Sequence, residues 1–291
     1  MTRVYVTGSL SGQLYWELSR SVPECVTWLE SDGRVDIRDK QAVKLVIEQL
    51  QPDVVINAAA YTAVDKAESE PDLAFAVNEA GVENLAAAAS SIGSRMLHVS
   101  TDFVFGQSDG KPFETNSAVS PVSVYGKSKL AGEQCLQRLL PQDSLIIRTA
   151  WVYSAHGGNF VKTMLRLMGE REELGVVADQ TGSPTWAFSL AEAIWRAVDR
   201  KVVGISHWTG AGVASWYDFA VAIAEEAQQC GLLETMPQIN ALTTEQYPTP
   251  ANRPAYSVLS LKENQDSLGI YPNHWRADLR RMLAEMRGIG R

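Results

Sequence analysis

The residues with the clearest chemical potential are a tyrosine and a lysine, Tyr125 and Lys129, four positions apart. Pro121 precedes them as a helix start, and on a helix this spacing places both side chains on one face. A free tyrosine phenol has a pKa near ~10, and a neighbouring ammonium group lowers it because it favours the phenolate. Tuned in this way, Tyr125 could donate a proton to a carbonyl oxygen as hydride reaches the carbon. The same spacing also occurs on ordinary amphipathic helices.

Such a carbonyl needs a second hydrogen-bond donor, and Thr101 is the candidate. It directly follows the apolar run 96–100, which predicts a strand, so it should lie at the carboxyl edge of a sheet. The order along the chain strengthens this reading: a glycine loop comes first, then Thr101, then the helix with Tyr125 and Lys129. Together they favour a nicotinamide-dependent reductase of the short-chain type.

The glycine loop follows a short strand candidate, residues 4–6, and contains Gly8 and Gly12. In dinucleotide-binding loops the first glycine permits a tight turn, the second lets the backbone approach a pyrophosphate, and a third lets the helix pack on its strand. Here Tyr15 stands where the third glycine is expected. Its side chain must be absorbed by a tilt of the helix or must line the cofactor groove. A strand-to-helix turn with incidental glycines is the alternative.

The residues after the second strand bear on the cofactor. Glu30 could accept hydrogen bonds from an adenosine ribose, which would favour NAD, whereas Arg34 and Arg38 could meet a 2′-phosphate. A solvated loop would also explain all three, so the choice between NADH and NADPH stays open.

The first half of the chain alternates β-branched runs with segments of helical periodicity. This alternation predicts an α/β fold, with a Rossmann-type doubly wound parallel sheet and a smaller, partly interleaved substrate-binding lobe. Strand ends should then converge on one crevice, which brings together Gly8, residues 57–60, Thr101 and Thr149. The strand candidates are 4–6, 25–28, 54–57, 96–100 and 145–148, and the helix candidates are 13–20, 39–49, 71–90 and 122–139.

After Ala150 the pattern of predicted elements changes: helical segments are separated by short strands, and residues 243–254 form a proline-rich stretch. We expect residues 1–150 to form the dinucleotide-binding domain and residues 151–291 mainly the substrate-binding lobe, with segments near 174–208 returning to the first domain. The helix candidates here are 159–171, 188–199, 215–229 and 275–286, and the strand candidates are 174–178 and 204–208.

Composition limits the classes of function. The chain has 291 residues and a net charge of −8, which argues against capture of nucleic acid or an anionic membrane. Cys25, Cys135 and Cys230 form neither a metal spacing nor a disulfide framework. No apolar stretch reaches the roughly 20 residues that span a bilayer, and the first residues run straight into a strand, leaving no room for a signal peptide. A cytoplasmic protein is the expectation.

Several sequence blocks resemble one family. The chain is similar to the dTDP-4-dehydrorhamnose reductases, a family of extended short-chain dehydrogenases/reductases, from its first strand to its closing helix. The blocks that carry the resemblance are QPDVVINAAAYTAVDKAESEP (51–71), STDFVF (100–105), PVSVYGKSKLAGE (121–133), RTAWVYSAHGGNFVKTML (148–165), VADQTGSPT (177–185) and YPTPANRP (247–254).

The resemblance implies the last step of dTDP-L-rhamnose synthesis, which serves cell-surface polysaccharides: NADPH or NADH reduces the C4 ketone of dTDP-4-dehydro-L-rhamnose. Tyr125 would donate the proton, Lys129 would hold the nicotinamide ribose, and Thr101 would bind the substrate oxygen. It further implies that a homodimer is the default assembly. The implied cofactor-binding residues are Gly8, Ser11, Gly12, Gln13, Leu14, Asp36, Ile37, Ala58, Ala59, Ala60, Tyr61, Tyr125 and Lys129. The implied substrate-binding residues are Thr101, Asp102, Phe103, Trp151, Asn159 and Arg253.

The chain departs from the family in three places. The glycine loop carries one inserted residue and ends in Tyr15, and Phe103 stands where the family generally has tyrosine. Some members use a divalent cation held by glutamates, but Phe188 occupies one such region, so the sequence does not support Mg²⁺. Two other functions stay open: a related nucleotide-sugar reductase or epimerase, and a non-catalytic nucleotide-binding regulatory member of the family.

Other conspicuous residues have ordinary explanations. Among the tryptophans only Trp151 is assigned a function, by packing on the sugar, and Trp216 is predicted to be packing at a helix start. Asp65, Lys66 and Glu68 follow a strand end, where a salt-bridge cluster and substrate contact are both open. The four histidines share no ligand spacing and predict no metal site: His98, in a strand, His156, His207 and His274.

Overall fold

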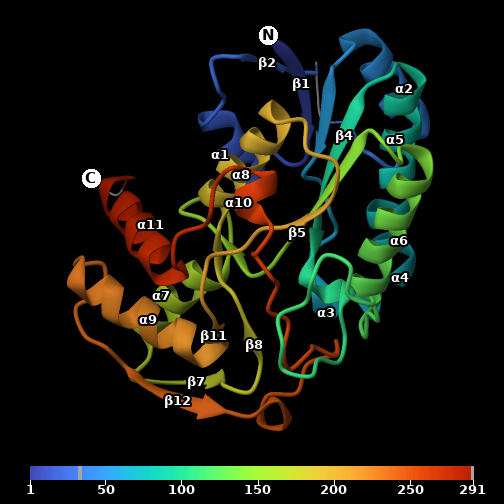
Figure 1. Ribbon diagram of the computed structural model, residues 1–291. Coiled ribbons are helices and arrows are strands. Elements are labelled where there is room, and N and C mark those ends of the chain that lie inside the picture. Colours follow the sequence, from blue (N-terminus) through green and yellow to red (C-terminus); the bar gives the residue numbers. More distant parts are fainter. Residues whose placement is uncertain (32–34, 290–291) are drawn as a thin grey trace.

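The computed structural model describes residues 1–31 and 35–289, and its centre is a parallel sheet of six strands (Figure 1). The strands lie in the order β10-β5-β4-β3-β1-β2, and every neighbouring pair is parallel. The predicted α/β class with a doubly wound sheet is confirmed. The strands are β1 (Thr2–Thr7), β2 (Val26–Leu29), β3 (Val54–Asn57), β4 (Arg95–Thr101), β5 (Ser144–Thr149) and β10 (Gly204–His207).

The strand order reverses direction at β1. From β1 the chain moves outward to β2, then crosses back so that β3 lies on the other side of β1. In open parallel sheets the loops diverge at such a switch point and leave a crevice at the carboxyl ends of the strands. The ends of β1 and β3 are Thr7 and Asn57, which pair in register. The first candidate ligand site therefore lies directly beyond these two residues.

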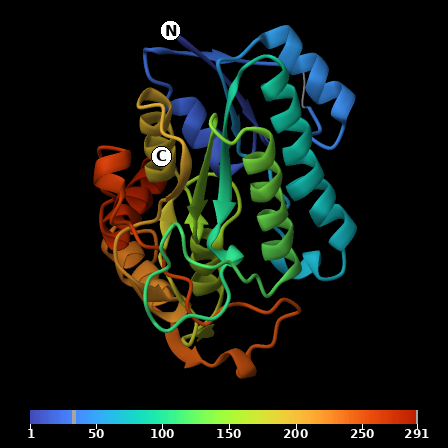
Figure 2. The ribbon, with the colours of Figure 1, turned by 45° about the vertical axis from the view of Figure 1, so that its right-hand side comes forward.

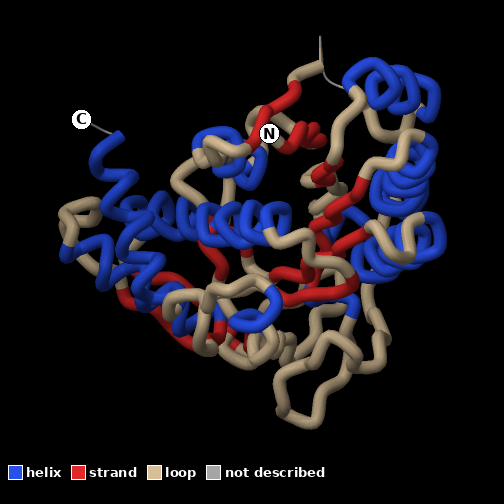
Figure 3. Tube along the Cα trace, turned by 45° about the horizontal axis from the view of Figure 1, so that its top comes forward, coloured by secondary structure: helices blue, strands red, loops and turns tan. Residues whose placement is uncertain are grey.

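Helices cover both faces of the sheet, as Figures 1 and 3 show. Alternate residues of each strand point to opposite faces, so Val4 and Val6 pack with α1 and α8, while Tyr5 packs with α2, α5 and α6. The helices of this part are α1 (Gln13–Arg20), α2 (Lys40–Leu50), α3 (Val64–Ala67), α4 (Pro71–Phe75), α5 (Gly81–Ser91), α6 (Val124–Leu139) and α8 (Ala187–Asp199).

A single π-helical turn, Ala76–Ala80, joins α4 to α5 and lets α6 dock closely. Its Asn78 side chain accepts the Tyr61 amide (2.9 Å) and donates to the Ser128 hydroxyl of α6 (3.0 Å). A Cβ at Gly132 of α6 would overlap the Asn78 carbonyl oxygen, so only glycine permits this approach. The start of α6 is set by Ser123, whose hydroxyl accepts the Gly126 amide (3.1 Å).

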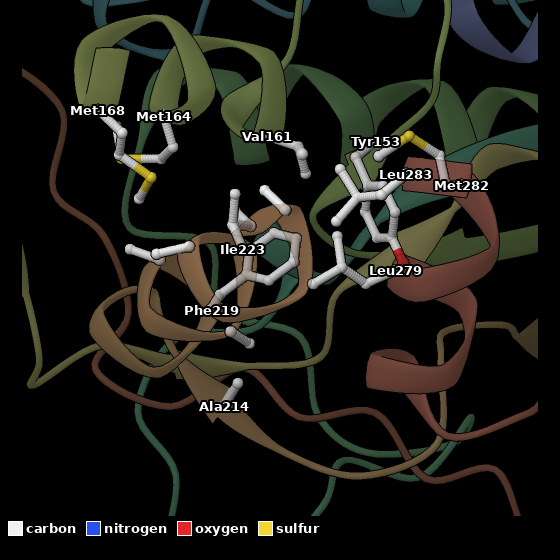
Figure 4. Close-up of a cluster of buried hydrophobic side chains, with 14 of the residues drawn as sticks. Tyr153, Val161, Met164, Met168, Ala214, Phe219, Ile223, Leu279, Met282 and Leu283 are labelled. Atoms are coloured by element: carbon white, nitrogen blue, oxygen red, sulfur yellow. The ribbon is translucent and has the colours of Figure 1, made fainter. Parts of the chain in front are cut away.

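The remaining chain forms a lobe with its own core, which Figure 4 shows around Phe219 and Tyr153. It lies beyond the carboxyl ends of the sheet strands (Figure 2). Its elements are β6 (Val152–Tyr153), α7 (Phe160–Glu170), β7 (Glu173–Val177), β8 (Thr181–Gly182), β9 (Thr185–Trp186), β11 (Ala214–Ser215), α9 (Trp216–Gln229), β12 (Gln238–Leu242) and α11 (Trp275–Ile289).

The chain returns from the lobe to the large sheet twice, the second time at α10 (Asn264–Ser267), after which Leu268 packs with α8 and the sheet strands. Helix α8 packs on the sheet and β10 joins it beside β5. Of the segments near 174–208 that were expected to return, β7 does not, because it pairs with β12 in a separate parallel pair inside the lobe. A short strand carries no signal of which partner it will find, since that partner lies some 60 residues away in sequence.

A buried ion pair ties α6 to the sheet. The Arg148 guanidinium of β5 donates to both carboxylate oxygens of Glu133 at 3.0 and 2.7 Å, and the two side chains are 4% and 1% exposed. Arg148 also donates to the Thr115 carbonyl oxygen (3.3 Å), so one guanidinium joins β5, α6 and the loop between β4 and α6. The pair therefore fixes the helix that carries Tyr125 and Lys129.

Breaking this pair should be costly. We expect Glu133→Gln to lower the free energy of unfolding by about 3 kcal/mol, because it leaves a buried guanidinium without its counter-charge. Glu83→Gln is the matched control, since Glu83 pairs with Arg138 of the same helix at the surface (2.7 Å), where a pair is worth at most about 1 kcal/mol. Urea unfolding of both variants measures the difference; equal losses would contradict the structural role given to Glu133.

Candidate active site

A cavity of about 650 Å³ opens at the switch point of the sheet. It gathers most of the residues expected to hold the cofactor, from the glycine loop at one end to Tyr125 and Lys129 at the other. Residues of this lining that the sequence singled out are Gly8, Ser11, Gly12, Gln13, Leu14, Tyr15, Asp36, Ile37, Ala58, Ala59, Ala60, Tyr125, Lys129 and Thr149.

The glycine loop makes a tight turn despite its inserted residue. Gly8 has a φ of 136°, which an L side chain rarely adopts, and the Gly12 amide closes the turn onto the Ser9 carbonyl oxygen (2.7 Å). Gly12 then caps α1 without any side chain of its own, so the first amides of the helix have no side-chain acceptor there. Free amides at a helix N-terminus suit phosphate oxygens.

Tyr15 lines the cavity and packs edge-on against Trp28 of β2, with ring centroids 5.5 Å apart. Of the two outcomes expected for this side chain, lining the groove is the one seen. The aromatic contact occupies the space between α1 and β2, so close packing of α1 against the sheet does not need a third glycine here. The altered loop therefore keeps the shape of a dinucleotide site.

Asp36 and Ile37 also line the cavity, and Glu30 lines an adjoining hollow of about 370 Å³ that shares Gly8 and Tyr15. Arg38, expected as a partner for a 2′-phosphate, instead donates to Asp36 (2.9 Å). This pairing lowers the pKa of the Asp36 carboxyl. The other candidate, Arg34, lies outside the described residues.

At the reacting end, Thr101, Tyr125 and Lys129 are all buried. The pKa of Tyr125 is raised to about 12, mainly by burial and further by the Asp102 charge, while a hydrogen bond with Thr101 opposes the rise. The expectation that Lys129 lowers this pKa was wrong. The Lys129 ammonium position contacts the Val99 carbonyl oxygen (2.7 Å) and a histidine, and burial lowers its own pKa to about 8.

Two buried hydroxyl groups support a polar ligand at this end. Ser100 and Thr149, at the ends of β4 and β5, line the cavity, and among the described residues neither hydroxyl has a hydrogen-bond partner. Buried polar groups are rarely left unpaired in proteins. The hydroxyls fit the carboxamide and ribose of a nicotinamide nucleotide, and the glycine loop at the other end fits its pyrophosphate.

Asp102 follows Thr101 and is almost fully buried. It accepts a hydrogen bond from the Thr101 hydroxyl (3.1 Å). Burial raises the pKa of its carboxyl from 3.8 to about 6, against the opposing effect of hydrogen bonds from Ser257 and Thr101. Its charge state therefore changes close to neutral pH.

On the lobe side, Phe103, Trp151 and Arg253 surround a small hollow of about 20 Å³. Trp151 has a φ of 47°, a strained conformation that costs about 1 kcal/mol or more and recurs at functional sites. Trp216 stacks on it with ring centroids 3.6 Å apart and planes 9° apart. One face of Trp151 is therefore covered, and Trp216, interpreted from the sequence as packing alone, lines the same hollow.

Arg253 holds a carboxylate in the structure. Its guanidinium donates to both oxygens of Asp65 (3.0 and 2.8 Å) and to the Thr249 hydroxyl (2.5 Å). Of the two readings left open for Asp65, a salt bridge is the one seen. The pair joins α3 to the proline-rich stretch of the lobe, and the guanidinium lowers the pKa of the Asp65 carboxyl.

Two expected site residues have other contacts. The Tyr61 hydroxyl donates to Glu70 (2.7 Å), and Thr62 lines the cavity where Tyr61 was expected. Asn159 caps α7 by accepting the Lys162 amide (3.1 Å) and donates to the Gln13 side chain (3.0 Å). Asn159 thus links the lobe to the glycine loop but lines neither hollow.

The region where the family places cation-binding glutamates has other contacts in this chain. Phe188 lies under the Arg20 guanidinium, 4.8 Å from its carbon to the ring centre, and Arg20 also pairs with Glu285 (2.9 Å). In the described part of the chain, no three His, Cys, Asp or Glu side chains gather closely enough to hold a metal ion.

Comparison with known proteins agrees with this geometry. Residues 1–288 match the family model described as RmlD substrate binding domain. The chain belongs to this family. It is 45% identical to a dTDP-4-dehydrorhamnose reductase of Aggregatibacter actinomycetemcomitans, over 98% of this chain and 99% of that protein.

Solved structures of the RmlD family superpose closely on the chain. One is a dTDP-4-dehydrorhamnose reductase from Clostridium acetobutylicum, with a TM-score of 0.91, 38% identity, and coverage of 98% of this chain and 99% of that one. Another, from Bacillus anthracis in complex with NADP, has a TM-score of 0.90 and 33% identity over the same shares. Across residues 1–31 and 35–289, none of the helices is long and apolar enough to cross a bilayer.

If the RmlD-family loop has adapted to its tyrosine, restoring a glycine should not help. We expect Tyr15→Gly to weaken NADPH binding several-fold, because the contact with Trp28 that shapes the groove is lost. Trp16→Gly is the control: it carries the same glycine penalty of about 1 kcal/mol in α1, but Trp16 stacks on His156 outside the cavity. Fluorescence titration with NADPH compares them, and tighter binding by Tyr15→Gly would contradict the adaptation.

Burial of Asp102 gives a pH-dependent prediction. Because its pKa is raised to about 6, the folded protein holds this proton more tightly than the unfolded chain, so the stabilisation present below about pH 4 is lost as the pH rises through about 6. Asp102→Asn does not titrate, so between about pH 5 and pH 8 its unfolding free energy should gain about 1–2 kcal/mol relative to wild type. Urea unfolding at both pH values measures this; a constant difference would contradict it.

Proposed function

We propose that this chain reduces the C4 ketone of dTDP-4-dehydro-L-rhamnose to dTDP-L-rhamnose with NADPH or NADH. Full-length similarity to proteins named dTDP-4-dehydrorhamnose reductase supports the substrate, and the relative solved with NADP supports the cofactor class. The observation that carries the proposal is one cavity lined by the glycine loop and by Tyr125 and Lys129, with Thr101 hydrogen-bonded to Tyr125.

Within this proposal the bound nicotinamide supplies the hydride. Tyr125 donates its phenolic proton to the ketone oxygen, and its raised pKa keeps that proton in place until the oxygen becomes negative. Thr101 positions the Tyr125 hydroxyl through their hydrogen bond, and so also the ketone oxygen that this hydroxyl meets. Lys129, which lines the cavity, donates a hydrogen bond to the cofactor ribose.

We assign the remaining roles by position. The cavity-lining residues from Gly8 to Leu14, with Asp36, Ile37 and Ala58 to Ala60, hold the dinucleotide. Phe103, Trp151 and Arg253, with Asp102 beside them, hold the sugar nucleotide. Asn159 holds the glycine loop by donating a hydrogen bond to the Gln13 side chain. Tyr61 holds the π-helical turn by donating its backbone amide to the Asn78 side chain.

The proposal includes the setting of the enzyme. Residues 1–150 with α8 and β10 form the cofactor-holding unit, and the rest of 151–291 forms the substrate lobe. All three cysteines are free, which suits a reducing compartment such as the cytoplasm. A homodimer is the assembly that the family resemblance supports, and the partner in the reaction is a dTDP-sugar, with neither nucleic acid nor membrane involved.

A spectrophotometric assay tests the function. Purified protein is mixed with NADPH or NADH and with enzymatically prepared dTDP-4-dehydro-L-rhamnose, and the absorbance of the reduced nicotinamide is followed. Loss of absorbance that requires both sugar and protein supports the reductase and ranks the cofactors. Activity only with another keto-sugar would favour a related nucleotide-sugar reductase or epimerase, and failure to bind either cofactor would favour the regulatory alternative.

The proton donor has its own test. We expect Tyr125→Phe to lower kcat at least a hundredfold while the affinity for NADPH stays within about threefold, because only the acidic hydroxyl is removed. Phe103→Tyr is the control, since it adds a hydroxyl to a ring 5.6 Å from that of Tyr125 without removing the donor. Turnover of Tyr125→Phe at the wild-type rate would end this mechanism.

A further inference from the structure

The segment between β6 and α7, residues 154–159, brings the lobe against the glycine loop. Its adjacent glycines, Gly157 and Gly158, line the cavity of about 650 Å³ together with the glycine loop and the start of α1. Both glycines belong to the lobe, whereas most of the cavity wall comes from the large sheet and its helices. The proposed mechanism uses neither of them.

Gly157 lies directly against the start of α1. Its φ is 68°, and a Cβ built there would lie 3.2 Å from the Ser11 carbonyl oxygen and 3.1 Å from the Gln13 Cγ. Glycine adopts this conformation without strain and permits so close an approach. The Asn159 side chain secures the contact, because its NH₂ group donates to the Gln13 side chain (3.0 Å) and to the Ser154 carbonyl oxygen (2.7 Å).

This contact brings two helix N-termini together. Gln13 is the first residue of α1 and Asn159 is the N-cap of α7, so the hydrogen bond between them joins the two helix starts. The N-terminus of a helix carries the equivalent of roughly half a positive charge. Two such ends side by side repel each other, and an anion beside both of them removes this repulsion.

Neither helix supplies that anion from its own first turn. Residues 13–16 and 160–163 include no acidic side chain. The next acidic residue of α1, Glu17, is fully buried, pairs with Arg20 and accepts the Ser154 hydroxyl (2.6 Å). Its charge is therefore already balanced within the protein, and the two helix starts are left to an anion from outside.

Both helix starts also have backbone amides to offer. Gly12 caps α1 without a side-chain acceptor. In α7 the Asn159 side chain accepts the Lys162 amide (3.1 Å), while the amides of Phe160 and Val161 have no acceptor inside the helix. Amides from two helix starts suit an acceptor with several oxygens, as in a pyrophosphate.

A second observation points to a polar ligand in this cavity. The hydroxyls of Ser100 and Thr149 line it, and within residues 1–31 and 35–289 they have no hydrogen-bond partner, although these residues are only 3% and 5% exposed. Buried polar groups are rarely left unpaired. A dinucleotide has polar groups along its whole length, so it can meet these hydroxyls and the two helix starts at once.

We propose that Gly157, Gly158 and the N-terminus of α7 form a second binding surface for the pyrophosphate of the cofactor, beside the glycine loop. The inference rests on the proposed function, in which this cavity holds NADPH or NADH. Because α1 packs on the sheet and α7 belongs to the lobe, the bound pyrophosphate links the two parts of the chain. The lobe then contributes to cofactor affinity as well as to substrate binding.

Charge substitutions at Gly158 test the proposal. In the described chain, a Cβ at Gly158 would meet no heavy atom within 4 Å beyond its neighbours, so a longer side chain fits without a clash. We expect Gly158→Glu to bind ADP and NADPH about tenfold more weakly than Gly158→Gln, because only its side chain repels the pyrophosphate. Gly158→Lys should bind both more tightly than Gly158→Gln. Calorimetric titration with ADP and fluorescence titration with NADPH give the dissociation constants.

Gly169 provides the matched control. It lies in the last turn of α7, and a Cβ there also meets nothing within 4 Å in the described chain. The length of α7, about 15 Å, separates it from Gly158 and exceeds the Debye length of about 10 Å at 0.1 M salt. We therefore expect Gly169→Glu and Gly169→Gln to bind ADP alike. Adenosine, which has no phosphate, should bind alike to the three Gly158 variants.

The outcomes separate this inference from the proposed function. Equal affinities of the three Gly158 variants for ADP would overturn the role of α7 even if the keto-sugar is reduced, and so would an equal loss of adenosine binding. Affinities for ADP in the order Lys, Gln, Glu would support the role even if no keto-sugar is reduced. If Gly158→Glu fails to fold, the comparison of Gly158→Lys with Gly158→Gln still decides. A wild-type protein that binds neither nucleotide would overturn this inference together with the cofactor class.

Discussion

The parallel strands of this sheet end at one edge, which brings the polar side chains near their ends close together. These side chains are buried, so each needs a hydrogen-bond partner within the protein. Thr7, Asn57 and His98 form a row one layer beneath the cavity, and each is satisfied by its neighbour. The residues that follow the row line the site: Gly8 follows Thr7, and Ala58 follows Asn57. A slip of one residue in β3 would turn Asn57 to the opposite face and break the row. The strand register thus sets both the loop that meets the cofactor and the lysine at its far end.

Helix α6 is the second element on which the site depends. It is held by an unusually close approach at Gly132 and by the buried pair of Glu133 and Arg148. Tyr125 and Lys129 lie within two turns of these contacts, so the same packing that stabilises the fold sets the positions of both groups. The π-helical turn at Asn78 supplies the facing surface. Placing functional side chains on such a rigid helix gives more precise geometry than a loop would.

Local patterns in the sequence were enough for most of the architecture. The predicted helix 13–20 has the bounds of α1, and the strand candidates of the first half all became strands, because periodicity and capping are local. What could not be predicted depends on distant partners. The stacking of Trp216 on Trp151 joins residues 65 positions apart, and the pairing of β7 with β12 is similarly remote. The pKa of Tyr125 was misjudged because burial, invisible in the sequence, outweighs a lysine that turns to His98.

The bond between Arg253 and Asp65 changes what an anion meets on arrival. The guanidinium is already bidentate to a carboxylate, so any phosphate that binds there takes part in an exchange of anions. The affinity of Arg253 for an anionic ligand then depends on the difference between its contact with that ligand and its contact with Asp65, which disfavours weakly charged ligands. The same Asp65 carboxylate of α3 also accepts the Ala251 amide (3.2 Å), so it holds both the guanidinium and the backbone of this segment. Within the proposed function, an anion that binds Arg253 competes with a contact that joins the lobe to α3, and added salt weakens both attractions.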